Sequence, residues 1–207
     1  MSTDAARVRR YYDDHTRQFL ALGQGTDGTI RRAVWGPGVA SRAEAMAFVD
    51  RLIGDRLERL SLARPLHVID LGCGVGTSLC RLATRLGLTG TGITLSPLQV
   101  ALATRRIAAL GLDGSVTCTE GDFCDLSHPI GPVDAAFAIE SFVHAQRASA
   151  FFAQASRIIR PGGVLMVCDD FLGPAEARRN PASAAWTTRF QHGWLASTVM
   201  TVADAVA

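Results

Sequence analysis

A glycine-rich turn between an apolar segment and a helical segment constrains the fold of this chain more than any other feature. The apolar segment LHVID, residues 66–70, is typical of a buried strand, and residues 77–87 have the spacing of a helix. Gly72, Gly74 and Gly76 lie between them. A strand that passes through such a turn into a helix begins an open α/β sheet, and ligands of these sheets bind at the carboxyl ends of the strands. The turn therefore predicts a fold class and the position of a ligand site.

The same alternation continues through residues 63–172, where five short apolar runs alternate with helical segments. It predicts a Rossmann-like, doubly wound, mostly parallel α/β sheet with helices on both faces. Residues 1–62 contain two amphipathic segments, at 4–22 and after Ser41, so we expect an N-terminal helical lid there. Residues 173–207 read as a linker and a helical segment with no further strand pair, as in a chain truncated after its fifth strand.

Two serines predict where helices begin. Ser41 is a typical N-cap because Glu44 follows three residues later as its capping-box partner, and the apolar spacing then predicts a helix to about Leu62. Ser96 is followed by Pro97, which favours the first position of a helix.

The composition excludes several classes of site. All 21 basic residues are arginines, which rules out Schiff-base lysines and the lysine of a P-loop. The formal net charge is only +2 and the arginines are scattered, so no nucleic-acid groove is indicated. The five cysteines form no CxxC pair and have no histidine at zinc spacing, so we expect reduced thiols and no bound metal. No apolar run is long enough to span a membrane, and we expect a cytoplasmic protein of open oligomeric state.

The spacing of the glycines disfavours a nicotinamide cofactor. A dinucleotide fold has Gly-x-Gly-x-x-Gly, but here the third glycine comes one residue early and Thr77 stands in its place. No acidic residue lies between Asp70 and Asp113, where an acid for the ribose would be expected. Asp70 instead precedes the turn by two residues, where it can pair with an ammonium group, and the small residues allow close approach of a ligand without phosphate.

The segment VIDLGCGVG, residues 68–76, resembles the first motif of class I S-adenosylmethionine-dependent methyltransferases. Glycine turns of this kind also occur without a ligand. The resemblance implies that S-adenosylmethionine is the cofactor and that it is bound by Asp70, Gly72, Cys73, Gly74 and Gly76.

The segment TGITLSPLQVALA, residues 91–103, is similar to the branch of this family that contains sterol, tocopherol, prenyl and cyclopropane-forming methyltransferases. That branch uses a threonine and a glutamine where other members use an acid. The resemblance implies that Thr94 and Gln99 hold the ribose hydroxyls. The alternative is that Thr94 only ends a strand, Ser96 only caps a helix and Gln99 is solvated.

Two later segments resemble further motifs of the branch. Asp122 and Phe123 match the pair that lies beside the adenine, although Asp122 is also consistent with a solvated loop residue. Glu140 and His144 resemble the catalytic Ile-Glu-Ala-x-x-His segment of sterol-type carbon methyltransferases, and would share one face if a helix begins after Ile139. The alternatives are a carboxylate that orders a helix start and a partly exposed helical histidine. Cyclopropane-forming relatives have an acidic residue immediately before this histidine. This chain has Val143 at that position, which argues against cyclopropane formation.

The N-terminal segments complete the comparison. YYDDHTRQFLALG resembles the helix that covers the cofactor in this branch, which implies that Tyr12 contacts the cofactor and Tyr11 the substrate. Trp35 stands where relatives carry a substrate lid and is a candidate wall of an apolar substrate site. Arg31 and Arg32 would suit an anionic substrate such as a prenyl diphosphate, or are solvated surface residues.

These features predict a methyltransferase that moves a methyl group to a carbon, or an oxygen, of a small apolar acceptor such as an isoprenoid or aromatic natural product. A complete fold of this class has seven strands, and only five can be counted here. The alternative is therefore a catalytically silent cofactor-binding module or a truncated methyltransferase.

Overall fold

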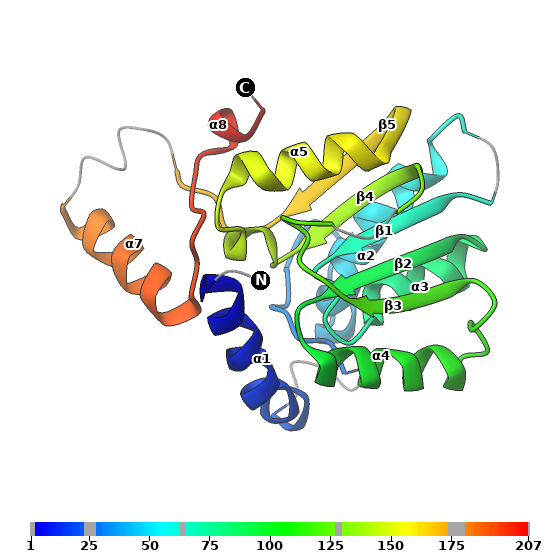
Figure 1. Ribbon diagram of the computed structural model, residues 1–207, viewed down its shortest axis with the longest axis horizontal. Helices are drawn as coiled ribbons and strands as arrows, with labels where there is room; N and C mark the ends of the chain where they lie inside the picture. Colours follow the sequence, from blue (N-terminus) through cyan, green and yellow to red (C-terminus); the bar gives the residue numbers. More distant parts are fainter. Residues whose placement is uncertain (1–2, 23–27, 63–64, 127–129, 174–180, 207) are drawn as a thin grey trace.

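Five parallel strands form a single sheet in the order β3-β2-β1-β4-β5 (Figure 1). The computed structural model describes residues 3–22, 28–62, 65–126, 130–173 and 181–206. The strands are β1 (His67–Leu71), β2 (Thr89–Thr94), β3 (Val116–Glu120), β4 (Val133–Ile139) and β5 (Ile159–Cys168). The parallel, doubly wound sheet predicted from the sequence is confirmed.

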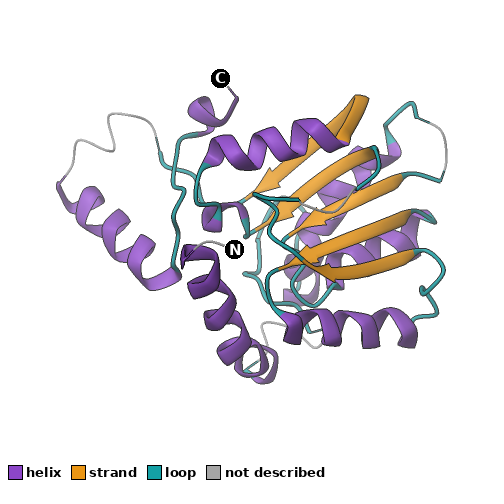
Figure 2. Ribbon diagram, viewed as in Figure 1, coloured by secondary structure: helices purple, strands orange, loops and turns teal. Residues whose placement is uncertain are grey.

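Helices cover both faces of this sheet (Figure 2). They are α1 (Thr3–Ala21), α2 (Arg42–Glu58), α3 (Thr77–Leu86), α4 (Pro97–Ala109), α5 (Ala148–Ile158), α7 (Pro181–Trp194), α8 (Val202–Val206) and the 3-10 turn η1 (Phe142–His144). Side chains of α2, α3 and α4 pack on one face, and those of α5 and η1 on the other. Successive strand residues alternate between the two cores, as Val68 and Ile69 do, because side chains of a strand point to opposite faces.

The predicted helix starts are confirmed. The Ser41 hydroxyl accepts a hydrogen bond from the Glu44 amide at 3.2 Å, and Ser96 does the same for Gln99 with Pro97 as the first residue of α4. The helix after Ser41 ends at Glu58 and not near the predicted Leu62. The chain leaves helical geometry there, and Leu60 and Leu62 pack on the core of the sheet.

The strand order creates a crevice at the carboxyl ends of β1 and β4. The chain moves from β1 to β2 on one side and later returns to β4 on the other, which is the switch point where open α/β sheets bind ligands. Of the two helices expected in the N-terminal lid, α2 packs into the core of the sheet, whereas α1 packs on α4 (Figure 1). The proposed boundaries at residues 62 and 172 remain predictions.

The segment after β5 contributes no strand pair within residues 169–173 and 181–206. It forms α7 and α8 and a single bridge between Leu172 and Thr201, and α7 stands away from the sheet (Figure 1). None of the helices in the described ranges combines the length and apolar character needed to cross a membrane.

Candidate active site

The glycine turn has the backbone shape expected of a ligand cradle. Gly72 and Gly74 have φ of 97° and 53°, in the left-handed region that favours glycine. A Cβ atom at Gly72 would lie 2.3 Å from the Ser141 side chain, so packing also requires glycine there. A Cβ at Gly74 would have no neighbour within 4 Å, so this backbone faces open space.

Asp70 ends up buried beside this turn, with a relative exposure of 2%. Within the described ranges no group donates a hydrogen bond to its carboxylate. Burial raises the pKa of Asp70 well above its ordinary value, the charge of Asp50 adds to this, and Arg31 opposes it. Asp70 and the turn residues Gly72, Cys73 and Gly74 line a cavity of about 50 Å³. A buried carboxylate that accepts no hydrogen bond from the described residues, beside an open backbone, suits a ligand that carries an ammonium group.

Thr94 and Gln99 lie at the end of β2 and the start of α4, and both are buried. The Thr94 hydroxyl donates to Gln99 Oε1 at 2.6 Å, and Gln99 Nε2 donates to the Thr16 hydroxyl at 3.1 Å. Gln99 is therefore not solvated, and that alternative is wrong, while the cap by Ser96 coexists with these contacts. Thr16 on α1 was missed because nothing in the sequence of an amphipathic helix marks a residue that meets α4.

Asp122 and Phe123 follow β3 as expected. Asp122 is partly buried, accepts a hydrogen bond from the Cys124 amide at 2.8 Å, and lines a cavity of about 690 Å³ with Arg9. Phe123 is buried, and its ring packs edge-on against Phe151 with centroids 5.5 Å apart. Their roles beside an adenine remain predictions.

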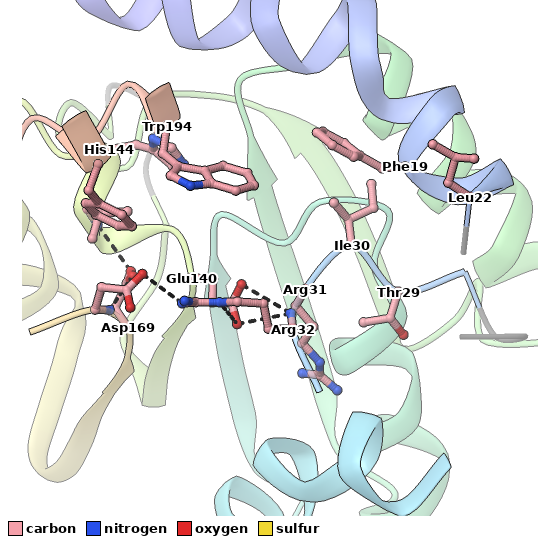
Figure 3. A pocket seen from close by; sticks show the side chains of 13 residues that line it. Phe19, Leu22, Thr29, Ile30, Arg31, Arg32, Glu140, His144, Asp169 and Trp194 are labelled. Carbon is pink, nitrogen blue, oxygen red and sulfur yellow. Dashed lines mark hydrogen bonds and ion pairs between the residues drawn. The ribbon is translucent and has the colours of Figure 1, made fainter. Parts of the chain in front are cut away.

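A second cavity, of about 250 Å³, opens where β4 and β5 end. Figure 3 shows its two sides, one apolar with Phe19, Ile30 and Trp194, and one polar with Glu140 and Asp169. Residues 29–31 line both this cavity and the one at the glycine turn, so the two lie next to each other. The full lining set is Phe19, Leu22, Thr29, Ile30, Arg31, Arg32, Glu140, Val143, His144, Asp169, Asp170, Phe190 and Trp194.

Glu140 is held in this cavity by an unusual backbone and by Arg32. Its φ is 50°, which is strained for a residue other than glycine, so Glu140 is not itself helical. The next helical element, η1, begins at Phe142 with Ser141 as its N-cap, so Glu140 does not cap it. The Arg32 amide donates to both Glu140 oxygens at 3.2 and 3.3 Å, and the Arg32 Nε lies 3.5 Å from Oε1. Burial raises the pKa of Glu140, and Arg32 opposes this by its charge and hydrogen bonds.

His144 is partly buried and lies in the 3-10 turn η1, so its position agrees with the alternative of a partly exposed helical histidine. Its Nε2 is 2.9 Å from the Tyr12 hydroxyl and its Nδ1 is 3.3 Å from the Leu195 carbonyl. A carbonyl only accepts, so Nδ1 carries the proton and Nε2 accepts from Tyr12. Burial lowers the pKa of His144 and raises that of Tyr12, which keeps both side chains neutral.

Asp169 is a functional candidate that the sequence did not reveal. It follows β5 directly and its carboxylate accepts hydrogen bonds from the amides of Val143 at 3.1 Å and Asp170 at 2.8 Å. Burial is the largest cause that raises its pKa, to about 6. Phe190 and Trp194 of α7 were missed as well, because the spacing of the C-terminal segment gives no sign of what it contacts.

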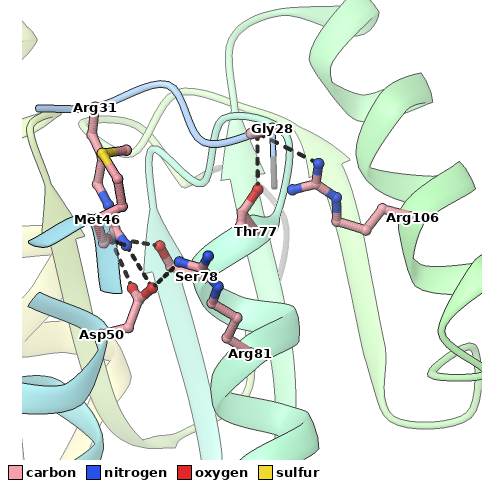
Figure 4. Close-up of polar contacts among 8 residues, drawn as sticks. All are labelled: Gly28, Arg31, Met46, Asp50, Thr77, Ser78, Arg81 and Arg106. Carbon is pink, nitrogen blue, oxygen red and sulfur yellow. Dashed lines mark hydrogen bonds and ion pairs between the residues drawn. The ribbon is translucent and has the colours of Figure 1, made fainter. Parts of the chain in front are cut away.

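The two arginines before α2 have different environments, and Figure 4 shows that of Arg31. Arg31 is buried, and its guanidinium donates to both oxygens of Asp50 and to Ser78, so it is not a solvated surface residue. Arg32 is half exposed and bonds Asp170 at 2.7 Å in addition to Glu140. The Arg31 network fixes the segment that separates the two cavities.

Two predicted substrate residues lie outside the cavity. Trp35 is 62% exposed and Tyr11 stacks on His15 with ring centroids 4.7 Å apart. Neither lines the cavity beside Glu140 or the cavity at the glycine turn. Tyr12 reaches the site, but through His144.

Known proteins resemble this arrangement in sequence and in fold. A family model described as "Methyltransferase domain" matches residues 68–163. An O-methyltransferase of Penicillium expansum is 37% identical over 57% of this chain and 45% of its own length. A sterol 24-C-methyltransferase of Neurospora crassa is 31% identical over 53% of this chain and 29% of its own length. The chain thus spans about half, or less, of the length of these relatives.

The solved structures agree with the sequence match. A mycolic acid cyclopropane synthase in complex with S-adenosylhomocysteine superimposes over 100% of this chain and 73% of its own, with a TM-score of 0.80 and 21% identity. At this identity the likeness establishes the fold. The family match, from β1 to the start of β5, and the O- and C-methyltransferase relatives agree with the resemblance seen in the motifs: residues 68–163 match a methyltransferase domain.

Proposed function

We propose that this chain is an S-adenosylmethionine-dependent methyltransferase that methylates a carbon, or an oxygen, of a small apolar acceptor of the isoprenoid or aromatic kind. One observation carries the proposal. An apolar cavity with acidic side chains at one end lies beside the cavity at the glycine turn, and residues 29–31 line both. This is the arrangement that methyl transfer between two bound molecules requires.

The residues at the turn fit the cofactor. Asp70 offers a buried carboxylate to the ammonium group of its methionine part, and the backbone at Gly74 is open to close approach. Thr94 and Gln99 would meet the ribose once Thr16 on α1 releases Gln99. When bound, S-adenosylmethionine supplies a methyl group on a sulfonium, which a nucleophilic carbon or oxygen of the acceptor can take.

The charge of the cavity favours an acceptor without an anionic group. Glu140, Asp169 and Asp170 line its polar end, and Arg32 is paired with two of them. Arg31 is bound to Asp50. Among the described lining residues no cation lacks an acidic partner, so a diphosphate would meet carboxylates and no free positive charge. We therefore favour neutral acceptors over the prenyl diphosphates considered from the sequence.

The two carboxylates suit the two demands of carbon methylation. When an alkene takes the methyl group, its new carbon–carbon bond leaves a positive charge on the neighbouring carbon. Glu140, which is paired with Arg32, would stabilise that charge. Asp169, whose pKa of about 6 lies near neutrality, accepts the proton whose loss restores the double bond. With an acceptor hydroxyl, Asp169 would accept the hydroxyl proton.

His144 and Tyr12 act as positioning residues in this scheme. The lone pair of His144 Nε2 is occupied by the Tyr12 hydroxyl, so the histidine is not free to take a proton from the acceptor. The pair instead holds α1 against η1, and His144 lines one wall of the cavity. This replaces the catalytic role that the resemblance implied for His144.

The test begins with isothermal titration by S-adenosylhomocysteine of the wild-type chain and of Asp70→Ala. We expect saturable binding that the variant loses. Turnover is then measured as S-adenosylhomocysteine formed with a panel of neutral isoprenoid alcohols and phenols. Glu140→Gln should keep the affinity for S-adenosylhomocysteine and lower turnover, whereas Asp113→Asn, an exposed carboxylate elsewhere, should change neither.

The outcomes separate the alternatives. Absence of binding by the folded wild-type chain would refute the proposed cofactor. Binding without turnover across the panel would favour the silent cofactor-binding module. Normal turnover by Glu140→Gln on an accepted substrate would remove its electrostatic role.

A further inference from the structure

Two cysteines that are far apart in the sequence meet at the glycine turn. Cys73 lies in the turn itself and Cys118 in the middle of β3, and their sulfur atoms are 3.3 Å apart. Both are free thiols, Cys73 buried and Cys118 partly buried. Neither thiol has a part in the proposed transfer chemistry.

The sheet is built so that these sulfurs come together. Gly92 pairs with Asp70 of β1 on one side and with Cys118 of β3 on the other, so the three residues share one level of the sheet. The Cys73 amide donates to the Ile93 carbonyl at 2.9 Å, which folds the turn back over β2. A Cβ at Gly92 would lie 2.7 Å from the Cys73 sulfur, so glycine at this position leaves the space in which the two thiols meet.

We propose that Cys73 and Cys118 are an oxidisable dithiol, which reacts with a low-molecular-weight disulfide such as glutathione disulfide to form an internal disulfide. Cys118, the more exposed thiol, attacks first as its thiolate and releases one glutathione. Cys73 then attacks the sulfur of Cys118 and releases the second. One sulfur–sulfur bond forms in the protein, one breaks in the oxidant, and the two thiol protons leave with the two glutathione thiols.

The disulfide would change the cofactor site. A sulfur–sulfur bond is about 2.0 Å long, so the present separation of 3.3 Å must close. This closure pulls Cys73, and with it the adjoining Gly72 and Gly74, toward β3. This consequence rests on the proposed function, because it assumes that the turn binds S-adenosylmethionine. The hydrogen bond with Cys118, burial and the charge of Asp70 raise the pKa of the Cys73 thiol, so oxidation should quicken as pH rises.

The test uses the full chain and excess glutathione disulfide at about pH 8.5, the ordinary pKa of a thiol. Peptide mapping without reductant should find a Cys73–Cys118 disulfide. Titration with S-adenosylhomocysteine should show affinity reduced on the order of tenfold or more, restored by dithiothreitol. Cys118→Ser and Cys118→Ala should bind S-adenosylhomocysteine as the reduced wild type does, and the oxidant should not change their affinity. Cys124→Ser, at another partly buried thiol, should lose affinity on oxidation as the wild type does.

Three results would overturn the inference. The first is no internal disulfide under excess oxidant, and the second is glutathione held stably on Cys118 alone. The third is a mapped disulfide with unchanged affinity, which would remove the link to the cofactor site. If the reduced wild type failed to bind S-adenosylhomocysteine, the proposed function would fall, whereas peptide mapping would still decide whether the dithiol exists.

Discussion

Replacing Asp70 with asparagine should make the chain more stable and its cofactor binding weaker. The Asp70 carboxylate is 2% exposed, lacks a hydrogen-bond donor within the described ranges, and lies near the charge of Asp50. Leaving a buried polar group unsatisfied costs about 1 to 3 kcal/mol, and more when it is charged. Asparagine keeps the shape and removes the charge, so the free energy of unfolding near neutral pH should rise by about 1 kcal/mol or more.

The pH dependence makes this prediction specific. The pKa of Asp70 in the folded chain lies above its ordinary value of 3.8, so the folded state binds this proton more tightly than the unfolded state does. The stability of the wild type therefore falls as pH rises from 3.8 through the folded-state pKa. Asp70→Asn has no such group to titrate, so its advantage should shrink as pH falls toward 3.8.

Urea unfolding at several pH values measures this effect, with Asp113→Asn as the exposed control. In parallel, the affinity for S-adenosylhomocysteine should fall about 10- to 150-fold, the equivalent of one charge-assisted hydrogen bond of about 1.5 to 3 kcal/mol. A variant less stable than the wild type near neutral pH, or a difference that does not depend on pH, would refute this account of Asp70.

Other changes test other parts of the structure. Asp50→Ala removes the acidic partner of the buried Arg31, so urea unfolding should show a free energy of unfolding lower by about 3 to 5 kcal/mol. The double change Asp50→Leu with Arg31→Met removes both charges and should recover most of this stability. Equal losses of stability in the single and the double variant would contradict this account. Gly74→Val fills the open backbone at a φ of 53° and should abolish titration by S-adenosylhomocysteine while the far-ultraviolet circular dichroism is retained. Turnover should fall as pH drops below about 6, because Asp169 becomes protonated there. Asp169→Asn should turn over slowly at every pH. A wild-type rate that does not change through pH 6 would exclude Asp169 as the base.

The parts of the site that were predicted correctly are those encoded locally. The glycine turn, the cap by Ser96 and the alternation of strands and helices each depend on residues a few positions apart. A strand that carries Asp70 near its end and runs into glycines has few other ways to fold, so the amino-acid sequence alone is enough to place the cradle. Thr94 and Gln99 were paired for the same reason, since only five positions separate them.

The parts that were missed depend on contacts between distant segments. Asp169 and Val143 are 26 positions apart and meet only because β4 and β5 are neighbours. In the sequence, Val143 stands where cyclopropane-forming relatives have an acid before the histidine. In the folded chain, the Asp169 carboxylate, directly after β5, accepts a hydrogen bond from the Val143 amide and so lies next to His144. Arg31 was misjudged in a similar way, because a charged residue in an irregular segment gives no local sign of the buried Asp50 that it meets.

Helix α7 has a position with consequences for how this chain can evolve. It contributes Phe190 and Trp194 to the wall of the cavity that holds Glu140 and Asp169, although none of its own side chains is buried. Substitutions at such exposed positions change the free energy of unfolding by only about 0.5 kcal/mol. Mutations along this helix can therefore alter which acceptor fits while the sheet and the cofactor cradle keep their stability. Acceptor preference and folding stability thus depend on separate segments of the chain, the first on α7 and the second on the sheet.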